Sequence, residues 1–535
     1  MNEQPGSRPE RAGLVLAALI AVATVANLNL SVANVAIPEI GDDFDSSQTT
    51  LNLIAVGYSF GLAASVLWFG ALGDRYGRKL LIVVGMTLSV PVSFLAGFAW
   101  SDDVLFAARV AGGLCAGMAY PTTLALITAL WAGRARTKAI ALWSAIGGGF
   151  AALGPLVSGI LLEHFDWGSV FLVTIPLAVI ALAMAVFLVP SHVNETTEPV
   201  DNVGGIVSVV LVGALILSIN FWPVNGMETT SLVLFVVAVV AAPLFLLRQR
   251  RAKNPLYDLR VAARPTFWVA ACAGIIVFGT LMGTAYVSQQ YVQNVLGYST
   301  VQAGAAILPA ALAMVLVAPR SAKLVAAYGS RITLLAGYVF LVLAFVGMLL
   351  LWNEGTPYWQ IALPYVCIGI GVGLAGTPAS NSLTASVPVR RVGMASGTAD
   401  LQRDLGGALM TSILGAVLTS HYASAMADQS VSSQVSSSTE SQLQLSFASA
   451  ENIAQHYPQD ADAIISAAQS SFLQGDQWAY GAGLLAVLAG AVLVFFLFPK
   501  RDREHELHVS YSAEDAVAPV SRPSPAGLEP AAADP

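Results

Sequence analysis

The chain has 535 residues, of which 56% are hydrophobic and 11% charged, and its mean hydropathy is +0.70. Soluble globular domains carry about 25% charged residues, so this composition excludes an ordinary soluble protein and indicates an integral membrane protein. The formal net charge of −7 comes from acids in short loops and tails, and we expect no nucleic-acid partner.

Apolar runs long enough to cross a bilayer, about 20 residues each, occur fourteen times along the chain. The expected fold class is therefore all-α, with fourteen transmembrane helices. Several runs exceed the minimum length, which indicates tilted helices. The predicted spans are 12–37, 51–72, 80–100, 104–131, 139–162, 169–189, 203–222, 230–247, 266–292, 301–319, 332–352, 358–382, 394–419 and 478–498.

The basic residues test this count, because Lys and Arg gather in the cytoplasmic loops of membrane proteins. Arg109 and Arg403 lie inside spans. With a cytoplasmic N-terminus, the other 23 of the 25 Lys and Arg residues fall in the tails and the even-numbered loops. The pattern predicts that both termini are cytoplasmic. The three cysteines lie within spans and the six histidines outside them or at their ends, so we expect neither disulfides nor a metal site.

The first span contains NLNLSVANVAIP at 27–38, which is similar to a signature of the drug:proton antiporters with fourteen spans. Where these proteins usually have an aspartate, this chain has Asn29, which cannot titrate. The resemblance implies that this aspartate couples transport to protons and faces an arginine of span 4, so the usual relay is altered here. Asn29 lies about 25 Å from the cytoplasmic start of its span, at a depth similar to that of Arg109. Asn34 is a further candidate for lining a substrate cavity.

The segment GALGDRYGRK at 70–79 places an acid and three bases between two apolar runs. Its glycines permit close backbone approach or positive φ, and its acid can pair with a nearby arginine or cap a neighbouring helix. The segment fills every fixed position of the loop signature between spans 2 and 3 of major facilitator superfamily transporters. An ordinary short basic loop is the alternative. We expect a conformational gate formed by Gly70, Gly73, Asp74, Arg75, Gly77, Arg78 and Lys79.

Spans 4 and 5 carry two further patterns of this superfamily. Span 4 reads LFAARVAGGLCAG at 105–117 and resembles a signature built on Arg109, although Gly112 replaces its usual glutamine. Span 5 reads GGGFAALGPLVSG at 147–159 and resembles the antiporter motif around Gly154 and Pro155, although Ser158 replaces a closing glycine. Glycines allow close helix packing and a proline weakens a helix locally. We expect Gly154 and Pro155 to belong to the gate, with ordinary packing as the alternative.

An internal repeat indicates how the chain is organised. Residues 322–331 align with 70–79 at an offset of 252 residues, as expected for a transporter with two parallel halves. The spans 203–222 and 230–247 contain almost no polar residues, so we expect peripheral packing or interface helices there. The predicted parts are a cytoplasmic tail at 1–11, a six-helix bundle at 12–189, two linker spans with cytoplasmic loops at 190–265, a second six-helix bundle at 266–498 that includes an external loop at 420–477, and a disordered cytoplasmic tail at 499–535.

Polar residues inside the second half are candidates for a functional site, because charge within a membrane is energetically unfavourable. Span 13 carries Asp400 and Asp404 at i and i+4, with Arg403 between them. Two neighbouring carboxylates in a poorly hydrated place can share a proton, which a proton-coupled carrier needs. A static Asp400–Arg403 ion pair is the alternative. Besides Asn29, Asn34 and Arg109, the residues expected to line a substrate cavity are Gln289, Gln290 and Tyr291 of span 9.

The resemblance covers essentially the whole chain and implies a secondary active transporter of the bacterial cytoplasmic membrane. The expected activity is proton-coupled export of small hydrophobic or amphipathic compounds by alternating access, performed by a monomer without a cofactor. Two alternatives stay open. One is an exporter of lipids or anionic metabolites that is not coupled through span 1, and the other is a membrane sensor or scaffold that transports nothing. We find no residue pattern of an enzyme.

Overall fold

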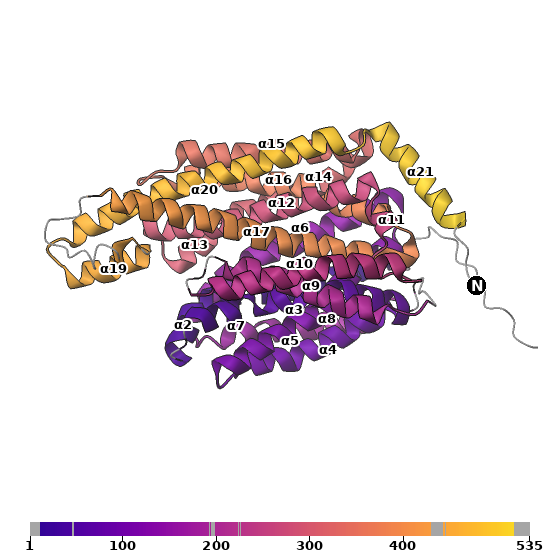
Figure 1. Ribbon diagram of the computed structural model, residues 1–535, viewed down its shortest axis with the longest axis horizontal. Helices are drawn as coiled ribbons and strands as arrows, with labels where there is room; N and C mark the ends of the chain where they lie inside the picture. The colour runs from indigo at the N-terminus through magenta and orange to yellow at the C-terminus, as the bar shows by residue number, and fades with distance from the viewer. Residues whose placement is uncertain are drawn as a thin grey trace, which may run out of the picture.

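The structure is a computed structural model that describes residues 11–44, 46, 48–191, 193, 198–222, 224, 226–429, 442–444 and 446–517. Within these ranges all regular secondary structure is helical, which confirms the all-α fold class. Figure 1 shows long helices running side by side, with the early helices on one side of the molecule and the late helices on the other.

The early helices, drawn in indigo and purple in Figure 1, form what we call the N-terminal group. It consists of α1 (Ala12–Ser31), α2 (Ala33–Phe44), α3 (Gln48–Tyr76), α4 (Arg78–Gly97), α5 (Asp102–Leu130), α6 (Gly133–Leu162), α7 (Ser169–Leu172) and α8 (Thr174–Leu188). Two intervening helices follow, α9 (Asn202–Phe221) and α10 (Glu228–Arg251), and then the short α11 (Leu259–Ala262).

The late helices form the C-terminal group. It consists of α12 (Pro265–Gln290), the π-helix η1 (Tyr291–Val295), α13 (Thr300–Ala306), α14 (Leu308–Tyr328), α15 (Ser330–Leu351), α16 (Tyr358–Ala385), the 3-10 turn η2 (Val389–Arg391), α17 (Val392–Ala427), α19 (Phe447–His456), α20 (Ala461–Leu497) and α21 (Arg501–Val517). That each group is a separate domain stays a prediction.

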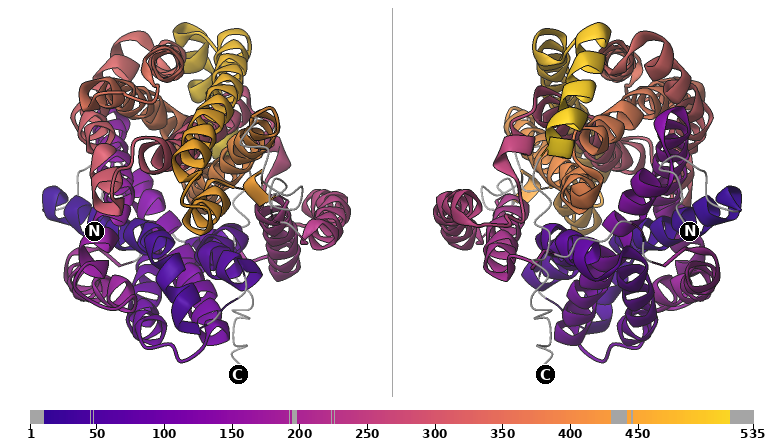
Figure 2. Two further views of the ribbon diagram at one scale, coloured as in Figure 1. Left: turned by 90° about the vertical axis from the view of Figure 1, so that its left-hand side faces the viewer. Right: turned by 90° about the vertical axis from the view of Figure 1, so that its right-hand side faces the viewer.

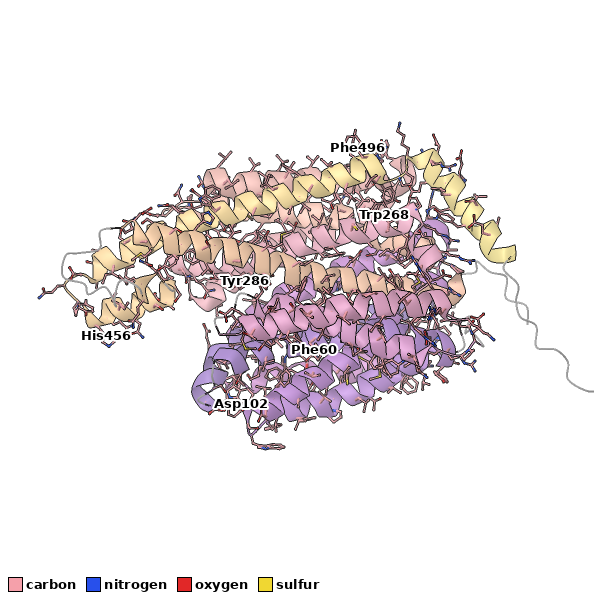
Figure 3. The ribbon with its side chains drawn as sticks, viewed as in Figure 1. Phe60, Asp102, Trp268, Tyr286, His456 and Phe496 are labelled. Carbon is pink, nitrogen blue, oxygen red and sulfur yellow. The ribbon has the colours of Figure 1, made fainter. Side chains whose placement is uncertain are left out.

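Thirteen helical segments of the described chain are long and apolar enough to cross a membrane. The remaining predicted span, 394–419, lies within α17, a helix of 36 residues that carries Asp400, Arg403 and Asp404. The total of fourteen therefore stays a prediction. Large apolar side chains cover the outside of the bundle, among them Phe187 and Phe496, of which Figure 3 labels the second. Such a surface is unfavourable in water and suits a lipid environment, so the chain is a multi-pass membrane protein.

Two helices stand on one flank of the bundle, as the end views of Figure 2 show. Here α9 packs against both α3 and α17, and α10 packs against α9. The Trp68 indole donates a hydrogen bond to Asn202 (3.2 Å), and Arg248 pairs with Asp201 (2.7 Å). The polar residues at the ends of these helices thus take part in packing. Helix α9 covers the seam between the N-terminal and C-terminal groups.

Two regions at the ends of the C-terminal group are more helical than the sequence predicts. The segment 420–477 is not simply a loop, because α17 continues to Ala427, α20 already begins at Ala461, and α19 lies between them. Its small residues tolerate helix while Phe447 and Phe472 are buried. The tail 499–535 contains α21, which is held by Arg264 over the Tyr511 ring (4.1 Å). The predicted disorder at 518–535 and the tail residues 1–10 lie outside the described residues.

Candidate functional site

The gate segment 70–79 is a helix break of one residue rather than a loop. α3 ends at Tyr76, Gly77 has φ 114°, and α4 starts at Arg78. Only Gly77 needs the conformational freedom of glycine for its dihedral angles. We call the end of the bundle that contains this break the basic end. The other end is called the opposite end.

Asp74 and Arg78 connect the two groups of helices at the basic end. The buried Asp74 carboxylate accepts hydrogen bonds from Arg78 Nη2 (2.7 Å) and from the backbone N–H of Gly393 at the start of α17 (2.8 Å). Arg78 also donates to the carbonyls of Val389 (3.0 Å) and Val193 (3.1 Å). The pairing and the capping that the sequence offered as alternatives for Asp74 thus occur together, because one carboxylate has two oxygens.

Gly70 of α3 is where the backbone of this segment lies against the backbone of α17. A Cβ added to Gly70 would lie 2.7 Å from the carbonyl oxygen of Gly393, whereas one added to Gly73 would be no closer than 3.7 Å to any neighbour. The two other bases of the segment lie at the surface of the same turn: Lys79 donates to the carbonyl of Val186 (2.8 Å), and the Arg75 guanidinium lies 5.8 Å from the Tyr76 ring. Tight contact between the groups therefore depends on Gly70 and Asp74.

The glycine-rich helix α6 connects the groups toward the opposite end. A side chain at Gly154 would collide with Ser31, and the Ser158 hydroxyl donates to the carbonyl of Val32 (2.7 Å), which separates α1 from α2. A Cβ on Gly304 of α13 would lie 3.2 Å from the Leu156 backbone, next to Pro155. The serine that replaces the motif's glycine therefore satisfies a carbonyl at a helix break.

Arg109 and Asn29 are neighbours, but not through the asparagine side chain. Arg109 Nη1 donates to the backbone carbonyl of Asn29 (2.8 Å), while the Asn29 amide donates to the Val25 carbonyl (3.1 Å) and accepts from Thr174 (3.2 Å). The guanidinium lies over the Tyr58 ring (4.9 Å), and its Nη2 has no hydrogen-bond partner. A cavity of about 20 Å³ lined by Asn29, Tyr58 and Gly112 lies beside it, large enough for about one water molecule.

Arg403 occupies the centre of the interface between the groups. It donates to Asn27 Oδ1 of α1 (3.0 Å) and to the Tyr120 hydroxyl of α5. Its guanidinium lies 5.0 Å from the Tyr120 ring, 5.7 Å from Trp143 and 5.3 Å from Phe278. A planar guanidinium suits such stacking between aromatic rings. Eleven residues after the start of α17, Arg403 lies about 17 Å from the basic end, near the middle of a bilayer of about 30 Å.

Asp400 is buried and unpaired one helical turn before Arg403. Its side chain is 1% exposed, and neither carboxylate oxygen has a hydrogen-bond partner. The expected alternative, a static ion pair between Asp400 and Arg403, is absent, because Arg403 is engaged by Asn27 and Tyr120. Asp404, also on the side of α17 that faces the N-terminal group, is half-buried, interacts electrostatically with Arg403 and Tyr58, and has one carboxylate oxygen without a hydrogen-bond partner.

The candidates of span 9 are not in this centre. Tyr291 is buried against Trp352, and its hydroxyl donates to the carbonyl of Asn353 (2.7 Å), so it packs within the C-terminal group and is not a cavity residue in this arrangement. Gln289 donates to the Ala303 carbonyl (2.8 Å), and Gln290 is half-buried at the end of α12. The side chain of Asn34 lies outside what the structure describes.

Sequence reasoning missed Asn27, Tyr120 and Trp143, which surround Arg403. Aromatic residues in spans are common, and only the fold shows which ones meet. It also missed Gln402, which is buried without a partner, and Asp476, which it assigned to a loop. Among the described residues, no group of three or more His, Cys, Asp or Glu side chains is placed to hold a metal ion.

A helical membrane bundle with the Asp74–Arg78 contact at the seam of two helix groups is the arrangement expected of a major facilitator transporter. Residues 19–411 match the Major Facilitator Superfamily family, and the chain belongs to it. The family predicted from the sequence motifs is thus confirmed, and the protein is a secondary transporter and not an enzyme.

Curated relatives and solved structures agree with this assignment. The chain is 32% identical to the multidrug efflux pump LfrA of Mycolicibacterium smegmatis, over 76% of this chain and 81% of that protein. It is 31% identical to the multidrug resistance protein Stp of Mycobacterium tuberculosis, over 72% of each. The crystal structure of the human organic anion transporter MFSD10 has the same fold, with a TM-score of 0.59, 13% identity, and coverage of 91% of this chain and all of that one.

Proposed function

We propose that this protein exports hydrophobic or amphipathic compounds across a bacterial cytoplasmic membrane in exchange for protons, by alternating access. The relatives named for multidrug efflux and multidrug resistance support export of such compounds. In this function the protein acts as a monomer, with the basic end and both termini in the cytoplasm, because Lys and Arg gather on that side.

The observation that carries proton coupling is the buried, unpartnered Asp400. An ionised carboxylate without a partner is strongly unfavourable away from water, and intramembrane acids of transporters commonly carry protons. Asp400 lies about 12 Å along α17 from the basic end, close to the bilayer midplane where transporters of this kind place their sites. Arg403, bonded to α1 and α5 rather than to Asp400, leaves the acid free to exchange its proton.

The proposed cycle uses the contacts at both ends. Protonation of Asp400 and Asp404 from the external side lowers the free energy of burying them, so the groups close around them. The Asp74–Arg78 contact to α17 then breaks at the basic end, and proton release there accompanies loading of the cargo. Because α17 carries both Gly393 and Asp400, the state of the acids and the state of the gate are coupled through one helix.

The test is proton movement in proteoliposomes that contain the full chain. Efflux of a lipophilic dye should drive proton flux in the wild type and in Asp103→Asn, a control acid that is exposed at the start of α5. The double variant Asp400→Asn with Asp404→Asn should lose the coupled proton flux while still binding the dye. Unchanged proton flux in the double variant would contradict the role of these acids.

Arg109 supports a second candidate, an exporter of lipids or anionic metabolites. Its buried guanidinium has one nitrogen without a partner and bonds to carbonyls rather than to an acid. A fixed positive charge of this kind attracts an anionic or zwitterionic head group. Asn29→Asp would add a negative charge to the residue whose backbone carbonyl binds Arg109, and it should impair export of an anionic cargo while sparing or improving that of cations. If both kinds of cargo respond equally, Arg109 does not select the charge.

A further inference from the structure

A second unpaired acid lies outside the central interface, on α20. Asp476 is 0% exposed, and neither of its carboxylate oxygens has a hydrogen-bond partner. Several other acids of the described chain are paired, as Asp201 is with Arg248 and Asp258 with Arg391. Asp476 belongs to a helix that packs against α12, α15 and α17, all in the C-terminal group.

An aromatic cluster lies next to Asp476, with which its members Tyr291 and Tyr480 interact electrostatically. We use this name for Tyr291, Trp352, Tyr365 and Tyr480. Tyr291 stacks on Trp352 with centroids 4.8 Å apart and planes at 9°, and the edges of Tyr365 (5.8 Å) and Tyr480 (5.5 Å) meet the same indole. Tyr480 follows Asp476 by one helical turn on α20, so both side chains lie on one face.

The hydroxyl groups of this cluster do not neutralise a negative charge. Tyr291 donates its proton to the carbonyl of Asn353 (2.7 Å) and Tyr365 donates to Ser288 (2.7 Å), while the Tyr480 hydroxyl has no partner. The titratable groups that interact with Asp476 are Tyr291 and Tyr480, without a Lys or Arg among the described residues. His421 of α17 is stacked instead on the exposed Trp478 (4.6 Å). A carboxylate here is therefore uncompensated, whereas a neutral carboxylic acid is tolerated.

We propose that Asp476 is a second proton-binding site, which takes its proton from water at the opposite end of the bundle and holds it while the aromatic cluster is closed. One carboxylate oxygen accepts the proton from hydronium, and water leaves. Release reverses this step when Tyr291 separates from Trp352 and water reaches the acid. Tyr291 begins η1, a π-helix, and such turns are frequent at functional sites. Protonation of Asp476 depends on the conformation of the C-terminal group alone and does not require Asp400 or Asp404.

Infrared difference spectroscopy on the reconstituted full chain tests this inference. A pH titration should show the carbonyl stretch of a protonated carboxylic acid at neutral pH. Asp476→Asn, which has nearly the same shape, should lose one such band. Tyr480→Phe should keep the band, because the carboxyl group remains. Asp476→Glu should keep a band at a shifted frequency, which provides a readout if the asparagine variant does not fold.

The outcomes separate this site from the proposed coupling. If the Asp400→Asn, Asp404→Asn double variant retains the band that Asp476→Asn removes, the site stands whether or not the central pair couples transport. If the spectra of the wild type and Asp476→Asn agree at every pH in the protonated carboxyl region, Asp476 is ionised and the inference is overturned.

Discussion

Replacement of Gly70 by alanine tests whether the contact between α3 and α17 closes the basic end. The added Cβ would lie 2.7 Å from the carbonyl oxygen of Gly393, so the helices must separate. Overpacking of this kind is destabilising by about 1–3 kcal/mol. Separation also weakens the charged hydrogen bond from Gly393 to Asp74, a type that contributes about 1.5–3 kcal/mol. With about 1 kcal/mol from overpacking and about 1 kcal/mol from the partly lost hydrogen bond, a combined loss of about 2 kcal/mol shifts the equilibrium about 30-fold away from the closed basic end.

The assay is a distance measurement between two spin labels at the basic end. One label replaces the exposed Tyr76 at the end of α3 and the other replaces the exposed Tyr328 at the end of α14, in a chain without its native cysteines. We expect Gly70→Ala to move the distance distribution toward longer values and to lower efflux in proportion.

Gly73→Ala is the matched control, because its Cβ would meet no atom closer than 3.7 Å. The structure predicts that this variant keeps the wild-type distances, although Gly73 is also one of the residues expected to form the gate. An unchanged distribution in Gly70→Ala, or an equal effect of both variants, would refute the reasoning.

Three further predictions concern packing and the tail. Ser158→Ala removes the hydrogen bond to the Val32 carbonyl and should lower stability by about 1 kcal/mol, measured by thermal unfolding in detergent; an unchanged melting temperature would contradict it. Trp143→Phe loses the hydrogen bond to Thr123 (2.8 Å) but keeps an aromatic ring near Arg403. This variant should have a similarly small effect on stability and should change dye affinity by no more than a few-fold. Loss of dye binding would instead assign the indole N–H a direct role. Burial in the docked α21 lowers the pKa of His508 despite the nearby Glu504. Docking is therefore favoured at pH values above the ordinary histidine pKa of about 6.5 and is lost as the pH falls below it. Hydrogen exchange of residues 501–517 should accelerate on acidification in the wild type and should not do so in His508→Gln.

The parts of the fold that follow from the sequence are those set by local composition. Apolar runs with basic residues at alternate ends predict spans and their order, and the i, i+4 spacing of Asp74 and Arg78 predicts their pairing. The ends of α17 and α20 were not predictable in this way, since a stretch of Ser, Ala and Gln is compatible with both loop and helix. That ambiguity also concealed Asp476.

The contacts that make the site depend on distant parts of the chain. Gly393 donates to Asp74 across 319 residues, and Arg403 reaches Asn27 across 376. Periodicity gives the face of a helix but not the partner of that face. For this reason the sequence suggested an Asp400–Arg403 pair from their spacing, whereas the fold offers Arg403 better partners on α1 and α5.

The lengths of α17 and α20 have a practical consequence. Helices of 36 and 37 residues measure about 55 Å, against a hydrocarbon core of about 30 Å, and in Figure 1 both extend with α19 past the rest of the bundle. Compact carriers give electron microscopists little to align once a detergent micelle hides them. This projecting helical region is a suitable epitope for antibody fragments, which would add the mass and the asymmetry that image reconstruction needs.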